Sequence, residues 1–596
     1  MSRRRHAGAL LVVLAALVRS AAGQGDPETI ERLLYEGREN SHVWKTLTYL
    51  CEEIGPRLTG STRLQRANEW TRDEFARLGL ANAHLFRWGE VPVGFDRGPS
   101  RVRMVAPSER ELEFTAAAYS PGTDGPVRAR LRARPETMAE LEELGSELQG
   151  NWILYTTEAL DRGSAGLSDE TSNEELLAIE GALDEIGIAG RIFASASELV
   201  VTGGVNGWRE LTLATLPKKI RIEVRRSDSE ALAEALARGP VEVEVDLAHR
   251  FVPGPVPLYD TIAEIPGREK PEEVIIFSGH LDSWDGPGSQ GAQDNGTGCA
   301  VMLEAARILM AAGVEPKRTI RFCLWTGEEQ GLLGSMAYVA SLTPEERARI
   351  SACFVDDGGT NYQGGVTCLP SQLAMLDEAI APVAGAFFDL PMENLARERS
   401  GGVRGIGSDH FSFNQAGIPG FFWIESGSGG REGKNYTFVH HTQHDTLRYA
   451  VQEYLVQSAT CSAVVAYQLA EAETLLPRQA PELEIAPPPD LTFVPVAGDF
   501  TGTWEARFVG ADAPDIRFTL ELEMAADGRL RGSSSSALGT ERITEGKWDA
   551  AAKRATFALV TEMGKLALTA HVEEGILLGT MSVMGQELAF RGSPKR

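Results

Sequence analysis

The sequence predicts an α/β protein, in which helices sandwich a mainly parallel mixed sheet and a β-rich insertion and a C-terminal β-module are added. Three observations carry this prediction. From about residue 258, apolar strand-like runs alternate with helical runs, which is typical of a parallel sheet covered on both faces. Short β-like runs dominate from about 101 to 252, and short alternating strands return after about residue 498.

The first 23 residues have the layout of a secretory signal peptide. Basic residues Arg3 to Arg5 precede an apolar run from Ala7 to Val18, and small residues follow it. This layout predicts export and cleavage near residue 23, although an apolar helix retained in the mature chain is the alternative. Because no run of about 18 apolar residues exists, we expect no membrane span. The signal-peptide layout predicts a secreted or periplasmic location.

The remaining chain divides by its patterns. In the first part of the α/β domain, apolar residues at helical spacing predict a helical stretch that ends at Gly55 and a helix over about 61–78. The predicted segments are residues 24–115 and 253–476 for the two parts of the α/β domain, 116–252 for the insertion, 477–496 for a proline-rich linker and 497–596 for the C-terminal module. In that last segment, Gly, Asp-Gly and Glu-Gly turns between alternating strands predict an antiparallel barrel or sandwich.

Composition excludes several classes of protein. The chain has 84 acidic against 58 basic residues and a formal charge of −26, which argues against nucleic acid or an anionic membrane surface as the main partner. Hydrophobic residues at 43% and charged residues at 24% are ordinary for a globular protein. The six cysteines form no CxxC pair, so a thiolate zinc site is not expected.

Polar residues follow the apolar strands of the α/β domain, where open α/β sheets bind ligands. The segments that contain them are SGHLDSWD, GAQDNGTG, WTGEEQG, ISACFVDD and VHHTQHDT. Each residue has an ordinary structural explanation: Asp294 as a helix N-cap, Glu328 and Glu329 as first-turn acids, and Asp356 and Asp357 as turn residues. Together, however, two histidines and several carboxylates are expected to converge on one crevice.

Imidazole and carboxylate ligands without thiolate are typical of a catalytic zinc site with an open position. Two metals about 3.5–4 Å apart can hold a water between them and polarise a carbonyl group. Asp294 is then the natural bridging ligand, with His280 on one metal and His441 on the other. One of two adjacent glutamates can bind metal while the other moves a proton, and Asp282 can orient His280 through its outer nitrogen.

These segments, with GSDHFSF and IGPRLTGS, resemble the co-catalytic zinc exopeptidases, which include bacterial secreted aminopeptidases and the carboxypeptidase Q type. The resemblance covers about residues 28–475. It implies the zinc-exopeptidase fold, two Zn²⁺ ions, and peptide or dipeptide substrates hydrolysed by metal-activated water. The implied roles are general base for Glu328, metal ligand for His280, Asp294, Glu329, Asp357 and His441, and supporting or substrate-facing shell for Asp282, Ser408, Asp409 and Asp445.

Several alternatives stay open. Asp356 can replace Asp357 as the ligand, and the resemblance does not decide between an aminopeptidase and a carboxypeptidase or dipeptidase of the carboxypeptidase Q type. Glutaminyl cyclisation on one zinc, or a non-catalytic receptor-like binding protein, are the rival functions. The insertion resembles a protease-associated domain, which implies a cap over the crevice, with a passive insert as the alternative. The sequence also leaves open whether the chain forms a homodimer.

Overall fold

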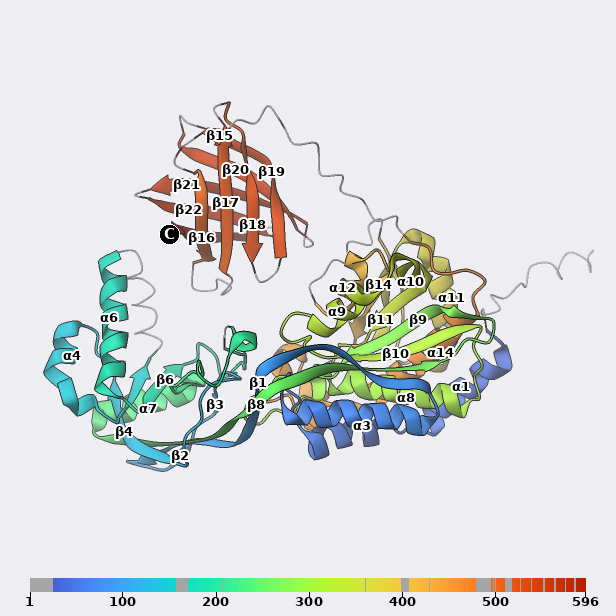
Figure 1. Cartoon of the computed structure of the whole chain (residues 1–596), viewed down its shortest axis with the longest axis horizontal. Coiled ribbons are helices and arrows are strands. Elements are labelled where there is room, and N and C mark those ends of the chain that lie inside the picture. Colours follow the sequence, from blue (N-terminus) through green and yellow to red (C-terminus); the bar gives the residue numbers. More distant parts are fainter. Residues whose placement is uncertain are drawn as a thin grey trace, which may run out of the picture. The chain divides into compact units, whose positions relative to one another are not determined.

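The computed structural model describes residues 25–156, 170–205, 207–359, 361–397, 407–427 and 429–478, and residues 495–595 with gaps of one to seven residues. The predicted signal peptide and most of the predicted linker lie outside the described residues. The described chain forms two compact units, one made of residues up to 396 together with 408–477, the other containing the residues after 477 (Figure 1).

The first unit is built on a mixed sheet whose central strands are parallel, which confirms the predicted α/β class. Strand β9 (Lys270–His280) lies between β10 (Arg318–Trp325) and β11 (Ile350–Val355) and runs parallel to both. Strand β14 (Gly420–Ser426) is parallel to β11. Antiparallel strands flank this centre, namely β12 (Tyr362–Cys368) beside β14 and β8 (Val241–Ile265) beside β10.

Helices cover both faces of this sheet (Figure 1). One face packs against α1 (Pro27–Glu39), α2 (Val43–Thr48), α3 (Thr62–Leu78), α8 (Thr297–Ala311), α11 (Pro370–Ala386) and α14 (Gln452–Glu471). The other packs against α9 (Leu333–Ser341) and α12 (His410–Gln415), and α10 (Pro344–Arg349) follows α9. None of the described helices is long and apolar enough to cross a lipid bilayer.

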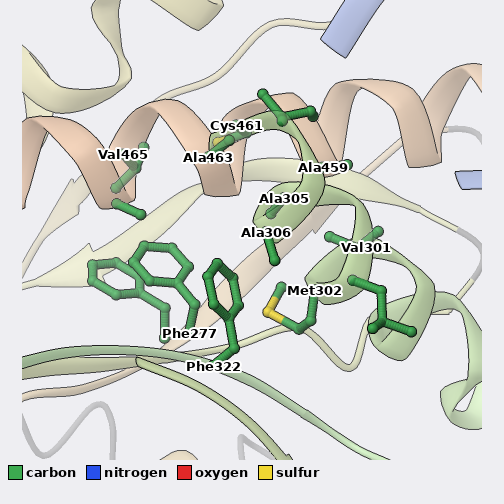
Figure 2. Close-up of a cluster of buried hydrophobic side chains, with 14 of the residues drawn as sticks. Phe277, Val301, Met302, Ala305, Ala306, Phe322, Ala459, Cys461, Ala463 and Val465 are labelled. Atoms are coloured by element: carbon green, nitrogen blue, oxygen red, sulfur yellow. The ribbon is translucent and has the colours of Figure 1, made fainter. Parts of the chain in front are cut away.

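The two cores follow the alternation of side chains along each strand. In β9, Ile275 and Phe277 belong to the core with α8 and α14, whereas Ile276 belongs to the core on the opposite face. Figure 2 shows the rings of Phe277 and Phe322 beneath α8 and α14. Both rings are fully buried, as a strand covered on both faces requires.

The first helical stretch is interrupted after Glu39, where its sequence pattern predicts continuous helix. Helix α1 ends at Glu39, α2 spans Val43–Thr48, and a π-helical turn (Tyr49–Ile54) reaches the predicted stop at Gly55. The break is held by tertiary contact, because the backbone N–H of His42 donates to Glu304 Oε1 on α8 at 2.9 Å. Helix α3 matches its prediction, with Ser61 as N-cap and Gly79 in the left-handed region at its end.

The insertion is carried by a long antiparallel ribbon of β1 (Ala81–Ala106) and β8. It contains more helix than the sequence pattern suggests. Its strands are β2 (Arg110–Glu111), β3 (Phe114–Thr115), β4 (Val127–Ala133), β5 (Trp152–Tyr155), β6 (Gly190–Ala194) and β7 (Arg221–Val224), and its helices are α4 (Met138–Leu144), α6 (Glu170–Ile186) and α7 (Arg226–Arg238). Strand β8 pairs with both β4 and β10, so the insertion and the α/β sheet share this strand.

The second unit contains a closed antiparallel barrel, one of the two architectures predicted for it. Its strands are β16 (Gly502–Phe508), β17 (Arg517–Ala525), β18 (Leu530–Ser536), β19 (Gly539–Asp549), β20 (Arg554–Thr561), β21 (Gly564–Glu573), β22 (Ile576–Val583) and β23 (Gln586–Pro594). Each pairs with the next, and β23 pairs with β16. Buried side chains such as Trp504, Leu520, Leu568 and Phe590 form its core.

Candidate metal centre

The predicted site residues gather at the carboxyl ends of three parallel strands. His280 is the last residue of β9, Glu328 and Glu329 follow β10, and Asp357 follows β11. Because parallel strands end at the same edge of a sheet, these side chains meet at one place. Asp294 reaches it from the turn before α8, and His441 from the loop before α14.

The first ligand group consists of His280, Asp294 and Asp357. Nε2 of His280 lies 3.2 Å from Oδ1 of Asp294 and 3.0 Å from Oδ1 of Asp357. The imidazole of His280 is fully buried. One ligand atom from each residue lies within 4.8 Å of the other two, as a shared metal ion requires.

The second group uses the other oxygen of Asp294. Nε2 of His441 lies 3.3 Å from Oδ2 of Asp294 and 2.9 Å from Oε2 of Glu329. His440 also approaches Asp294 Oδ2, at 3.7 Å, and its ring packs on that of His441. Ligand atoms of Asp294, His440 and His441 lie close enough to share an ion. Among the described histidines only His441 also pairs with Glu329, which favours His441 over His440 as the ligand.

Asp294 therefore presents each of its oxygens to a different histidine. Its carboxylate is buried, and Oδ2 accepts no hydrogen bond of good geometry from the described residues. Burial by itself would raise the pKa of Asp294, but the two histidines outweigh it and hold the pKa well below its usual range. A buried, ionised carboxylate with an unfilled acceptor fits a divalent cation.

Neighbouring carboxylates also raise the pKa values of the two histidines. Burial would lower the pKa of His280, but Asp357 and Glu328 outweigh it and raise the pKa well above its ordinary value. Burial also opposes protonation of His441, whose pKa is nevertheless raised to about 11, chiefly by Glu329 and Asp294. Metal binding requires neutral imidazole, so a metal at this site would displace these protons.

The adjacent glutamates have different surroundings. Glu329 accepts a hydrogen bond from the backbone N–H of Trp284 at 3.2 Å and pairs with His441. No hydrogen bond to the carboxylate of Glu328 occurs within the described part of the chain. Burial, followed by the charge of Asp294, raises the pKa of Glu329 to about 7. Burial raises the pKa of Glu328 well above its usual value, and Asp357 adds to that rise although His280 opposes it.

Asp282 supports both glutamates. Its carboxylate accepts the backbone N–H of Glu328 at 3.3 Å and that of Glu329 at 3.4 Å. It also accepts the hydroxyl of Thr59 at 2.8 Å. The outer nitrogen of His280, Nδ1, lies 3.1 Å from the backbone carbonyl oxygen of Asp282 and 3.7 Å from its carboxylate. The backbone carbonyl is thus the nearer partner for orienting the imidazole.

The two aspartates after β11 point to different partners. Asp357 faces His280, whereas Oδ2 of Asp356 accepts a hydrogen bond from Nε2 of Gln363 at 2.6 Å. Burial raises the pKa of Asp356 to about 6. The geometry places Asp357 in the ligand group and Asp356 in a separate polar contact.

The remaining predicted residues lie around these groups. Asp445 accepts the backbone N–H of Gln293, next to Asp294, and burial together with the charge of Asp294 raises the pKa of Asp445 to about 8. Ser408 and Asp409 are fully buried. Burial raises the pKa of Asp409 to about 7, and Asp282 and Asp357 contribute while His280 opposes the rise.

Sequence reasoning assigned no role to four residues that lie at the site. The guanidinium of Arg57 donates to the backbone carbonyls of Leu281 and Gly291, each at 2.7 Å, and so joins the two metal-site loops. Arg57 and Thr59 belong to IGPRLTGS, a segment noticed only as part of the resemblance. Trp284, within HLDSWD, contacts His441 edge-on with ring centroids 6.1 Å apart.

The fourth is Tyr436. Burial raises the pKa of its hydroxyl well above the ordinary value, and the charges of Asp294 and Asp357 add to the rise. Its ring packs on that of His440 with centroids 4.9 Å apart, so the phenol lies beside the candidate ligand groups. The sequence offered no signal for it, because Tyr436 belongs to none of the strand-end motifs.

Comparison with known proteins agrees with this geometry. Residues 260–466 match the family described as Peptidase family M28. Carboxypeptidase Q of Mus musculus is 28% identical over 453 residues, covering 76% of this chain and 90% of that protein. Aminopeptidase YwaD of Bacillus subtilis is 24% identical over 451 residues, covering 72% of this chain and 85% of that protein.

A solved structure shares the fold. The peptidase M28 precursor from Shewanella amazonensis SB2B superposes with a TM-score of 0.51 at 24% identity, covering 76% of this chain and 99% of that one. The resemblance found in the sequence motifs is thereby confirmed. This chain is thus similar to carboxypeptidase Q and to a bacterial aminopeptidase, and its residues 260–466 match the model of peptidase family M28.

Proposed function

We propose that this protein is a secreted dinuclear zinc exopeptidase that hydrolyses peptides or dipeptides, of the aminopeptidase type. The observation that carries the proposal is the placement of Asp294, whose Oδ1 faces His280 and whose Oδ2 faces His441. One carboxylate with a histidine at each oxygen suits a bridge between two cations better than a ligand of one. Export is inferred from the N-terminal layout of residues 1–23.

The ligand assignment follows the two groups. His280 and Asp357 would hold one zinc, His441 and Glu329 the other, and Asp294 both. The donor set contains imidazole and carboxylate only, as in catalytic zinc sites. When bound, the two ions would lower the pKa of water and polarise the scissile carbonyl group.

Glu328 is the base in this proposal. Its carboxylate is partly buried beside the ligand groups and, unlike that of Glu329, is not engaged by a hydrogen bond from the described residues. It would take a proton from the attacking water and deliver it to the nitrogen of the leaving amine. Asp282 holds its backbone in place at 3.3 Å.

A carboxylate beside the ligand groups supports recognition of a free amino terminus. The three carboxylates and two imidazoles of the two ligand groups would be taken up by the two zinc ions. Glu425, at the end of β14, adds another carboxylate: its Oε1 is buried without a hydrogen-bond partner among the described residues. A Cβ placed on Gly358 would collide with that carboxylate, so it lies directly against the Asp357–Gly358 backbone. Burial raises the pKa of Glu425 well above its usual value, and a substrate ammonium group beside it would favour its ionised form.

Three alternatives have different support. A carboxypeptidase or dipeptidase of the carboxypeptidase Q type rests on the relative that covers 76% of this chain. Glutaminyl cyclisation would need one zinc, and the two ligand groups argue against it. A receptor-like protein would need none, and the retained donors argue against that.

We also assign residues 116–252 as a protease-associated domain beside the crevice.

Zinc stoichiometry of the purified mature protein, together with hydrolysis of free and N-blocked dipeptides, tests the proposal. Two zinc ions per chain, chelator-sensitive cleavage and no cleavage of the blocked substrate are expected. Cleavage of the blocked dipeptide would replace the aminopeptidase by a carboxypeptidase. Absence of bound metal and of turnover after zinc is added would refute the enzyme and favour the receptor-like protein.

A further inference from the structure

A short stretch of the insertion pairs with the loop that carries His441. We call Val200–Thr202 the clasp segment. The backbone N–H of Thr202 donates to the carbonyl oxygen of His441 at 2.8 Å, and Val201 forms an antiparallel bridge with Thr442. The backbone N–H of Val200 donates to the side chain of Gln443 at 3.3 Å.

The clasp segment is anchored on the insertion side. The hydroxyl of Thr202 lies 2.7 Å from that of Thr115, the last residue of β3. Directly after the segment, the carbonyl oxygen of Gly203 accepts the N–H of Ala118 at 2.8 Å. The side chain of Gln443 in turn donates to Glu113 at 3.0 Å. Bonds on both sides therefore fix the position of the segment.

A third stretch packs against the clasp segment from the metal-site loop after β9. A Cβ placed on Gly286 would lie 2.0 Å from Oγ1 of Thr202, so only glycine fits there. A Cβ placed on Gly204 would lie 3.2 Å from the ring of Trp284. Trp284 itself contacts both Glu329 and His441.

His441 needs such support because its backbone is strained. Its φ is +57°, in the left-handed region that residues other than glycine rarely adopt. Strained backbone of this kind persists only when its surroundings hold it. The bond from Thr202 ends on the carbonyl oxygen of this same residue, so it constrains the dihedral angles that aim the imidazole at Asp294 and Glu329.

We infer that the insertion completes the metal centre: Thr202 of the clasp segment is a positioning residue that holds His441 as a ligand of the second zinc. The inference rests on the proposed zinc-binding role of His441. It assigns the insertion a part in the metal centre itself, in addition to any contact with substrate. Displacing the clasp segment should weaken the zinc ion held by His441 and spare the one held by His280 and Asp357.

The Gly286→Ala variant displaces the segment, because its new methyl group meets Oγ1 of Thr202. Gly203→Ala is the matched control, since a methyl group there meets nothing within 4 Å. Zinc titration of the mature full-length protein in chelator buffers measures both sites. We expect about 10–100-fold weaker binding at one site in Gly286→Ala, as for loss of other groups that orient a ligand, and no change in Gly203→Ala.

Rescue separates positioning from general damage. The Gly286→Ala/Thr202→Ala variant lacks the colliding oxygen and keeps the backbone N–H, but it loses the contact with Thr115 and keeps Cβ of residue 202 at 3.0 Å from the new methyl group. Zinc binding should therefore recover in part. Wild-type affinity at both sites in Gly286→Ala, or equal weakening at both sites in a folded variant, would overturn the inference.

If Gly286→Ala does not fold, the Gln443→Ala variant tests the inference instead, because it removes the hydrogen bond from Val200 of the clasp segment and adds no atom. Weakening at one site supports the inference, and unchanged binding at both sites contradicts it. A wild-type protein that does not bind two zinc ions would instead refute the proposed function.

Discussion

The Glu328→Gln variant tests which of the two adjacent glutamates moves the proton. Glutamine has the same shape as glutamate but cannot take up a proton near neutral pH. The substitution keeps the backbone bond to Asp282 and breaks no side-chain hydrogen bond found in the described chain. We therefore expect the fold, the melting temperature and the zinc content of the variant to match the wild type.

The expected loss is in turnover. General base catalysis by a positioned side chain contributes about 10²–10⁴-fold, or roughly 3–5 kcal/mol of activation free energy at about 1.4 kcal/mol per tenfold. Burial raises the pKa of Glu328 above its usual value, whereas the cations of the proposed site would lower it, so we expect a loss within this range. The value of kcat should fall while KM changes little.

Steady-state hydrolysis of a free dipeptide measures this loss, with zinc content determined on the same samples. Glu329→Gln is the matched comparison, since it disturbs the pair with His441 and should lose zinc as well as activity. Turnover of Glu328→Gln within tenfold of the wild type would refute the assignment. Loss of zinc from Glu328→Gln with retention in Glu329→Gln would exchange the two roles.

Four further outcomes follow from the structure. His441→Ala should bind one zinc ion fewer by elemental analysis, and two retained ions would contradict its role. Asp282→Ala removes the acceptor of three hydrogen bonds and should lower zinc affinity or kcat about 10–100-fold. If both values stay unchanged, the Asp282 carboxylate does not help to position Glu328 and Glu329. Phe277→Ala, at a fully buried ring stacked 4.9 Å from Phe354, should cost about 3–5 kcal/mol in urea unfolding, and a loss below about 1 kcal/mol would contradict tight packing. Burial, then the charge of Arg97, lowers the pKa of His249 to about 3, so His249 takes up a proton only in the unfolded chain as the pH falls below about 6.5. The free energy of unfolding should therefore fall less in His249→Gln than in the wild type between pH 7 and pH 5, as measured by urea titration. An equal fall in both proteins would show that His249 does not contribute.

Particular elements show why sequence succeeded where it did. The strands β9, β10 and β11 were predicted because a strand buried on both faces is apolar along its whole length. The capping residues Ser61 and Gly79 mark the ends of α3 because cap chemistry is local. The break between Glu39 and Val43 was not predicted, since the bond from His42 to Glu304 joins residues far apart in the chain. The spacing of apolar residues within the stretch contains no information about such a contact.

The sequence by itself determined which residue types lie at the strand ends, and hence imidazole and carboxylate as the donor set. That follows because the period of apolar residues and the position of polar ones are properties of neighbouring residues. Only the tertiary structure decided that the two oxygens of Asp294 face different histidines, that Asp357 rather than Asp356 faces His280, and that Thr202 of the insertion bonds to His441. Each of these depends on distances between segments remote in sequence, which packing of the whole sheet and its insertion sets and which no local pattern encodes.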